Sequence, residues 1–263
     1  MTITNTLGAK FVGQFMDMEL AFASGSIGPT FTCHHLFGEN PAAGTSWQDV
    51  WITGGVYSWP QTAGAVSIVS ASTNDTATGI GARTVVVEGL DANFRNISET
   101  ITVTGQLTAT GARLFRRVNK IYVEHIGTYD GSTVASHGAI TATHLGTATA
   151  KIEVSVVSFG RTELARYTVP AGHTAYVNEV DINVDSTKFG SVIMFARENA
   201  DVTTAPFTAK QAIEIWEGLS GPYSHSFNAP QRFPAKTDIW FVCKAAQAAT
   251  PMNVSFDIFL TPE

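Results

Sequence analysis

The stretch SASTNDTATGIGARTVVVEGLD contains the residues whose spacing comes nearest to a phosphate-binding loop. Gly79 and Gly81 precede a β-prone run, whereas a dinucleotide-binding fingerprint needs a third glycine at position 84 and then a helix. Position 84 is Thr84, and strand-like residues follow it, so the donors of a helix N-terminus are missing. We therefore interpret the glycines as a tight connection between strands near 65–70 and 83–88, where glycine supplies positive φ.

Cys33, His34 and His35 are the residues best suited by type to bind a metal ion. Adjacent histidines on a strand point to opposite faces, and no second ligand cluster follows at the spacing of a zinc site. Ser220 lies in GLSGP, which departs from the G-x-S-x-G nucleophile motif because Pro222 occupies its last position. The sequence predicts no metal, no cofactor and no catalytic residue, although a carboxylate pair from distant strands stays open.

Four aromatic residues, Trp47, Trp51, Tyr57 and Trp59, cluster within 13 residues. In a sugar-binding module such rings form an exposed platform on which sugars stack. In a β-sandwich they more often anchor a core or an interface, because large rings bury much apolar area. Both interpretations remain open from the sequence.

The proportion of charged residues is low. Of the 263 residues 14% are charged, against roughly 25% in an average soluble protein, and the net charge is −6. Charge depletion is expected where much of the surface ends up inside an interface. A surface rich in Thr, Ser and Asn is the alternative explanation.

Several classes of protein do not fit this composition. No run of Lys and Arg indicates a nucleic-acid partner, and no apolar run approaches the roughly 20 residues that span a membrane. The first residues lack the pattern of a signal peptide. Cys33 and Cys243 are far apart, and we expect both to be free thiols.

The elements that position these residues are predicted to be strands. Apolar residues alternate with polar ones over 152–156, 179–185 and 253–261, as in strands covered on one face. Turn residues separate such segments at short intervals. Only 16–23 and 209–217 have a pattern that allows a short helix.

The fold class that follows is all-β, with two consecutive antiparallel β-sandwich, jelly-roll-like domains and little helix. A stretch of small residues at 144–150 indicates the boundary, which gives domains at 1–145 and 151–263. Within the first domain, residues 1–45 are a possible anchoring segment. Strands are expected in the second half near 152–158, 163–169, 174–184, 190–197, 210–216, 223–227, 238–244 and 253–260.

The order of several longer motifs resembles virion structural proteins of tailed bacteriophages, many of them marine. WQDVW leads to Tyr57 and to SIVSASTNDTATGIGARTVVVEGLDANFRNISETITVTG, followed later by RYTVPAGHTAYVNEV and FPAKTDIWF. The similarity covers most of residues 47–245. It implies a structural protein without catalytic residues, made in the host cytoplasm and assembled there into the virion.

We therefore expect a non-enzymatic virion protein, in the first place a capsid decoration (cement) protein on the head surface. Its partners would be copies of itself, as a homotrimer, and virion proteins such as the major capsid protein, with no direct contact to nucleic acid or membrane. A tail component (adaptor, nozzle or fibre-base protein) is one alternative. A carbohydrate- or receptor-binding β-sandwich is another, and a hydrolase on a jelly-roll scaffold is a third.

Overall fold

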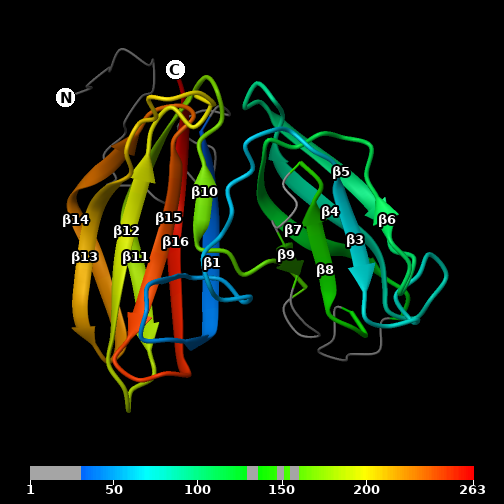
Figure 1. Cartoon of the computed structure of the whole chain (residues 1–263), viewed down its shortest axis with the longest axis horizontal. Coiled ribbons are helices and arrows are strands. Elements are labelled where there is room, and N and C mark those ends of the chain that lie inside the picture. The colour runs from blue at the N-terminus through cyan, green and yellow to red at the C-terminus, as the bar shows by residue number, and fades with distance from the viewer. Residues whose placement is uncertain (1–30, 129–135, 147–150, 155–159) are drawn as a thin grey trace, which may run out of the picture.

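The computed structural model describes residues 31–128, 136–146, 151–154 and 160–263, which form two β-sandwiches beside each other (Figure 1). This part of the chain is all-β and contains no helix, so the predicted fold class is confirmed. The membrane criterion, a long apolar helix, is met nowhere among these residues. The strands are β1 (Thr32–Ala43), β2 (Gln48–Asp49), β3 (Val66–Ser70), β4 (Ala82–Leu90), β5 (Asn96–Thr102), β6 (Ala109–Thr110), β7 (Arg117–Ile126), β8 (Ile140–His144), β9 (Lys151–Val154), β10 (Arg166–Thr168), β11 (His173–Val184), β12 (Gly190–Arg197), β13 (Gln211–Leu219), β14 (Gly221–Phe233), β15 (Asp238–Ala245) and β16 (Thr250–Pro262).

Eight strands form a jelly roll. One sheet has the order β1-β16-β11-β14 and the other the order β10-β15-β12-β13, with antiparallel neighbours throughout. The two-residue strand β2 adds to the edge of β15 beside β10. Along the chain, successive strands alternate between the two sheets, except for β12 and β13, which are neighbours in one sheet. This alternation is that of a jelly roll, whose two sheets pack face to face.

The second sandwich is inserted between the first two strands of the jelly roll, β1 and β10. Its sheets have the orders β6-β3-β8-β9 and β5-β4-β7. Their inner faces bury a separate apolar core that includes Ile68, Val85, Val87, Ile121 and Ile140. The chain enters this sandwich through residues 50–65 and returns through residues 160–165.

The predicted division into residues 1–145 and 151–263 is wrong at both boundaries. Strand β1 pairs along its length with β16, from Thr32 opposite Leu260 to Ala43 opposite Thr250, and so belongs to the C-terminal jelly roll. Strand β9 pairs with β8 and belongs to the inserted sandwich. Sequence patterns show that a segment is a strand, but they do not show which distant strand supplies its partner.

The predicted anchoring segment 1–45 also needs correction. Its residues 32–43 are the first strand of the jelly roll, where Leu36 and Ala43 contribute to the core. Residues 1–30 lie outside the described residues, as does the helix allowed at 16–23. The other possible helix, 209–217, is instead strand β13 over most of its length.

Gly79 and Gly81 lie in the connection between β3 and β4, which belong to different sheets. Neither glycine is among the residues with positive φ, which corrects the expected reason for their presence. Glycine is required at both positions because a side chain would have no room there. A Cβ atom on Gly79 would lie 2.1 Å from the Asn74 carbonyl oxygen, and one on Gly81 would lie 2.0 Å from Asp75 Oδ1.

Asp75 explains why the backbone packs so closely at this connection. Its buried carboxylate accepts the backbone N–H groups of Ala82, His137 and Gly138, and the hydroxyl of Ser70. A buried carboxylate needs several donors to offset the loss of its hydration. The connection is therefore structural, as predicted, and the side chain of Asp75 organises it.

Candidate functional site

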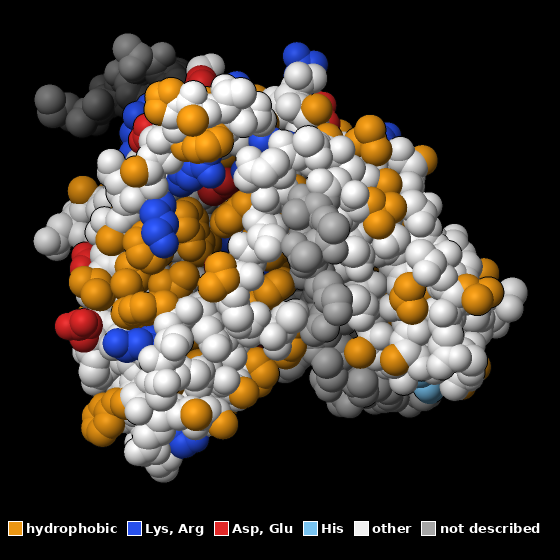
Figure 2. All heavy atoms as spheres, in the orientation of Figure 1, with side chains coloured by type: hydrophobic (Ala, Val, Ile, Leu, Met, Phe, Trp, Pro, Cys, Tyr) orange, Lys and Arg blue, Asp and Glu red, His pale blue; other side chains and the backbone are white. Residues whose placement is uncertain are grey.

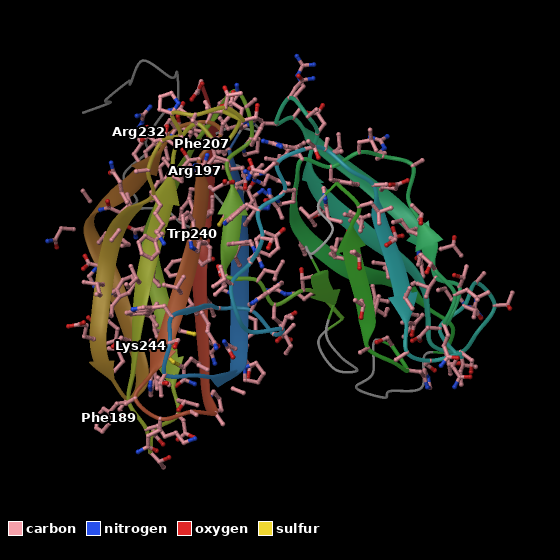
Figure 3. The ribbon with its side chains drawn as sticks, viewed as in Figure 1. Phe189, Arg197, Phe207, Arg232, Trp240 and Lys244 are labelled. Atoms are coloured by element: carbon pink, nitrogen blue, oxygen red, sulfur yellow. The ribbon has the colours of Figure 1, made fainter. Side chains whose placement is uncertain are left out.

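A groove with a volume of about 560 Å³ opens on the outer face of the sheet β10-β15-β12-β13. Figure 2 shows apolar side chains gathered in a hollow of this face, with basic side chains at its margin. In Figure 3, Trp240 lies near the middle of the face, Arg197 and Phe207 towards one end, and Lys244 towards the other. The lining residues are Trp47, Gln48, Asp49, Val56, Tyr57, Trp59, Ile193, Phe195, Arg197, Phe207, Thr208, Lys210, Asp238, Trp240 and Val242.

The floor of the groove comes from strands that are apolar on both faces. In β12, Val192 and Met194 point into the core, while Ile193 and Phe195 point outward into the groove. Strand β15 is buried along almost all of its length, with Trp240 and Val242 on the groove side. Outward-facing strand positions are normally polar, so these two strands are built for a face that is covered.

Five aromatic rings form a continuous series from beneath the groove to its floor. Ring centroids lie 5.4 Å apart from Trp51 to Tyr57, 5.3 Å from Tyr57 to Trp59, 5.6 Å from Trp59 to Trp240 and 5.5 Å from Trp240 to Phe195. The first three contacts are edge-to-face and the last is stacked, which are the arrangements that aromatic quadrupoles favour. The rings fix one another's orientation.

A buried arginine sits against this series. The guanidinium carbon of Arg166 lies 3.3 Å from the centroid of Tyr57 and 5.1 Å from that of Trp51. Its terminal nitrogens have no hydrogen-bond partner among the described residues, so the ring faces are its main compensation. Burial lowers the pKa of Arg166, and the neighbouring Tyr57 and Asp49 act in the opposite direction.

Three further cations lie over rings at the rim. Lys210 Nζ is 4.5 Å from the centroid of Phe195, and the Arg197 guanidinium carbon is 5.6 Å from that of Phe207. At the other end, Lys244 Nζ is 5.2 Å from the centroid of Trp47. Such side chains cover apolar surface with their stems and leave their charged ends near solvent.

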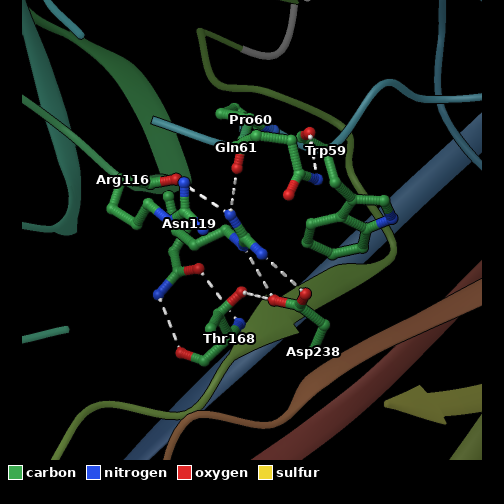
Figure 4. A network of polar contacts seen from close by, with 8 residues as sticks. Trp59, Pro60, Gln61, Arg116, Asn119, Thr168 and Asp238 are labelled. Atoms are coloured by element: carbon green, nitrogen blue, oxygen red, sulfur yellow. Dashed lines mark hydrogen bonds and ion pairs between the residues drawn. The ribbon is translucent and has the colours of Figure 1, made fainter. Parts of the chain in front are cut away.

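The wall of the groove is joined to the inserted sandwich by a buried ion pair. Arg117 of β7 donates from Nε and Nη2 to the two carboxylate oxygens of Asp238, at 2.9 Å each, and from Nη1 to the Pro60 carbonyl at 2.6 Å (Figure 4). The hydroxyl of Thr168 donates to Asp238 at 2.7 Å. Asn119 closes the network with two hydrogen bonds to the Thr168 backbone.

The second carboxylate of the groove, Asp49, is also engaged. It lies in β2 and accepts the backbone N–H of Tyr57 at 2.8 Å, which holds the connecting segment against β15. Burial raises the pKa of Asp49 above its ordinary value, while Arg166 and Lys210 act to lower it. Both groove carboxylates therefore have structural partners.

The predicted aromatic cluster divides into two roles. Trp47 and Trp59 line the groove and are partly accessible, whereas Trp51 and Tyr57 are each only 4% exposed and belong to the core of the inserted sandwich. The buried pair is therefore core, as one of the two interpretations predicts, although Tyr57 also reaches the groove wall.

The sequence analysis missed the rest of the groove. Phe195, Trp240 and Phe207 come from β12, β15 and the loop before β13, which are distant in the chain. The signal that identifies the first two is the unbroken apolar character of 192–195 and 239–243. Phe207 follows no strand pattern, and its 52% exposure only becomes notable beside the other rings.

The residues with metal-binding side chains at 33–35 diverge on β1. His35 Nδ1 lies 2.7 Å from Asp257 Oδ1 on the outer face, whereas the ring of His34 stacks on Tyr167 on the other side. Burial lowers the pKa of His34. Among the described residues, no group of three or more His, Cys, Asp and Glu side chains is placed to hold a metal ion.

Comparisons with known proteins do not identify a family for this chain. No family model and no curated protein matches the chain. Among solved structures, infectious bursal disease virus (Gx strain) aligns over 89% of this chain and 73% of its own, with 8% identity and a TM-score of 0.26. An isomalto-dextranase of Arthrobacter globiformis aligns over 78% of this chain and 34% of its own, with 12% identity and a TM-score of 0.23. TM-scores this low establish neither a shared topology nor a shared function.

Proposed function

We propose that this chain is a non-enzymatic structural protein of a tailed-phage virion, a capsid decoration protein that assembles as a homotrimer on the head surface. Its partners are further copies of itself and the major capsid protein. The motif order between residues 47 and 245 and the low charged fraction of 14% support this function. A protein whose surface is largely covered in an assembled shell needs less surface charge than a protein that must stay soluble as a monomer.

The observation that carries the proposal is a pair of long edge strands on one side of the jelly roll. Strands β13 and β14 each pair on one side only among the described residues, and the rings of Trp216 and His225 bring them together. Both strands are largely exposed, and their charged residues are only Glu214, Glu217 and Arg232. Edges of this kind, with few charges to discourage pairing, suit contact with another subunit.

Exposed apolar residues extend the same side. Ile215 on β13 is 47% exposed and Tyr223 on β14 is 40% exposed. In a heterologous interface, one copy presents these strands and the next copy presents a different surface, and a ring closes after three copies. The aromatic groove lies on the outer face of the same sheet as β13, where Ile215 stands opposite Ile193 of the groove lining.

Immunogold electron microscopy of purified virions, with an antibody raised against this chain, tests the function directly. We expect label over the heads. Label confined to the tail or to one vertex would instead indicate a tail component, such as an adaptor, nozzle or fibre-base protein. Particles without label would overturn the virion proposal altogether.

Light scattering of the purified chain tests the assembly separately. The chain mass is 28.1 kDa, and we expect a species of three times that mass at micromolar concentration. A double variant, Ile215→Lys with Tyr223→Lys, places charges on the two edge strands and should return the protein to the monomer mass. A monomer in the unmodified protein would contradict the homotrimer.

A further inference from the structure

We propose that the aromatic groove on the jelly roll binds an acidic saccharide, with one sugar face against the floor rings and its carboxylate against the basic rim. This inference does not depend on the virion function. It assigns a ligand class to the groove on the outer face of the sheet β10-β15-β12-β13.

The groove supplies apolar ring surface for a sugar. Phe195 and Trp59 are partly accessible, whereas Trp240 is only 8% exposed and supports both rings, stacked on Phe195 at 26° and meeting Trp59 at 67°. Aromatic faces carry negative potential, which attracts the polarised C–H groups of a pyranose face. The volume of about 560 Å³ falls within the range of about 300–1,000 Å³ that is typical of small-molecule sites.

The rim supplies positive charge that no protein group neutralises by a direct ion pair. Arg197, Lys210 and Lys244 each lie over an aromatic ring, and none forms an ion pair within the described part of the chain. The chain as a whole carries a net charge of −6, so this basic margin runs against the overall charge. Charge complementarity therefore selects an anionic ligand.

Arg197 provides the most specific sign of a missing partner. Its Nε atom is shielded from solvent and has no hydrogen-bond partner among the described residues, although the residue lines the groove. A donor left without a partner in this way costs free energy. A carboxylate in the groove would accept from Arg197 as a charge-assisted hydrogen bond, one of the stronger kinds in proteins.

The two carboxylates in the groove do not cancel this preference. Asp238 is held by Arg117 and Thr168, so its charge is already compensated. Asp49 is buried in β2 and accepts from the Tyr57 backbone. Lys210 and Arg197 are thus left for a ligand, whereas a purely apolar peptide would bury them without any partner.

Isothermal titration calorimetry with the full chain tests the ligand class. The probes are tetragalacturonic acid, its fully methyl-esterified form, an N-acetylneuraminic acid trimer, a glucuronate-containing hexasaccharide and polyglutamate. We expect at least one acidic saccharide to bind, and the methyl ester, which keeps the sugar faces but loses the charges, to bind at least about tenfold more weakly than the acid if galacturonate is the ligand. Polyglutamate, a polyanion without sugar rings, should not bind measurably.

Matched variants locate the binding. Phe207→Ala and Arg197→Gln should each weaken binding by about tenfold or more. The controls are Phe189→Ala and Arg232→Gln, which remove an exposed ring and an exposed guanidinium outside the groove (Figure 3) and should leave affinity unchanged. Circular dichroism establishes that each variant is folded before it is titrated.

Several results would overturn the inference. They are no binding of any acidic saccharide, equal binding of the ester and the acid, equal binding of polyglutamate, or equal losses in the groove and control variants. Shortening of a saccharide during the titration, detected by chromatography, would show a hydrolase in place of a binding site. None of these results bears on where immunogold label appears, so the two proposals fail independently.

Discussion

The two outer faces of the jelly roll differ in polarity: one carries mainly polar side chains and the other carries apolar side chains. On the sheet β1-β16-β11-β14, the outward residues include Asp181, Asn183, Ser255 and Asp257, and Asp181 lies opposite Ser255 in the register. On the sheet β10-β15-β12-β13, outward positions hold the rings and aliphatic chains of the groove. One face is made for water, whereas the other is made to be covered.

The difference teaches how to read alternation in a strand sequence. Polar residues at every second position of β11 and β16 mark the face that meets solvent. In β12 and β15 the alternation is lost because both faces of each strand carry apolar side chains. The inward side chains pack in the core, and the outward ones line the groove together with residues of the segment 47–59. Loss of alternation in an antiparallel sheet therefore locates a second covered surface.

The largest difference between the two faces is expected when one carboxylate is removed from each. Asp238→Ala leaves Arg117 as a buried charge without its partner, because both side chains are only 2% exposed. We expect a loss of about 4 kcal/mol in the free energy of unfolding. Asp257→Ala removes the 2.7 Å hydrogen bond between its carboxylate and His35 Nδ1. Because the two side chains are 46% (Asp257) and 61% (His35) exposed, this should cost about 0.5 kcal/mol or less.

Urea denaturation followed by tryptophan fluorescence measures both values under the same conditions. The matched pair is informative because each substitution deletes the same group from a strand of the same jelly roll. Equal losses would mean that the Arg117–Asp238 pair is compensated by water or by its other hydrogen bonds, and that it does not hold the two sandwiches together.

Replacing one aromatic ring by alanine on each face gives the next largest expected difference in stability. Trp240→Ala removes the ring that stacks on Phe195 and meets Trp59, and it opens a cavity under the groove. We expect a loss of about 3 kcal/mol. Phe259→Ala, on the outer face and half-buried, should cost about 1 kcal/mol because water can fill the site. Urea midpoints measure both, and a larger loss for Phe259 would contradict the contrast.

A buried acid without a hydrogen-bond partner among the described residues adds a pH dependence to the stability of the fold. Glu163 is 0% exposed, neither of its carboxylate oxygens has a hydrogen-bond partner among the described residues, and burial with nearby Glu39 raises its pKa to about 7. The folded state holds this proton more tightly than the unfolded state does. Its stabilising contribution is therefore complete below pH 4.5 and is lost as the pH rises through 7.

Glu163→Gln keeps the shape of the side chain and removes its titration. We expect the unmodified protein to lose about 2 kcal/mol relative to this variant between pH 5 and pH 8. Urea midpoints at pH 5, 6, 7 and 8 give the two slopes. Parallel slopes would show that the carboxylate stays ionised in the folded protein, with water as its partner.

Much of the fold is predictable from the sequence, for a local reason. The strand expected at 190–197 is β12 with the same bounds, and 238–244 differs from β15 by one residue. Alternation and turn residues are local properties. The pairing of β1 with β16, about two hundred residues away along the chain, leaves no local signal, so neither the insertion of one sandwich into the other nor the domain boundaries followed from the pattern.

The groove was predictable only in part, for a related reason. Trp47 and Trp59 stand close together in the chain and attracted attention as a cluster. Trp240 and Phe195 stack only because β15 and β12 pair in the sheet. Phe207 lies in a loop, where no periodicity marks its direction. A site assembled from several distant strands becomes visible only when the sheet order is known.

The smallest expected effect separates binding from folding on the aromatic face. Phe207 is 52% exposed and contacts Arg197 across the rim, so its ring contributes little to the core. Phe207→Ala should change the free energy of unfolding by about 0.5 kcal/mol or less, in contrast to Trp240→Ala. Urea denaturation measures this against Tyr223→Ala on the edge strand, another half-exposed ring. A loss above about 2 kcal/mol would mean that Phe207 is part of the fold, and its use as a binding variant would then have to pass to Lys210→Ala.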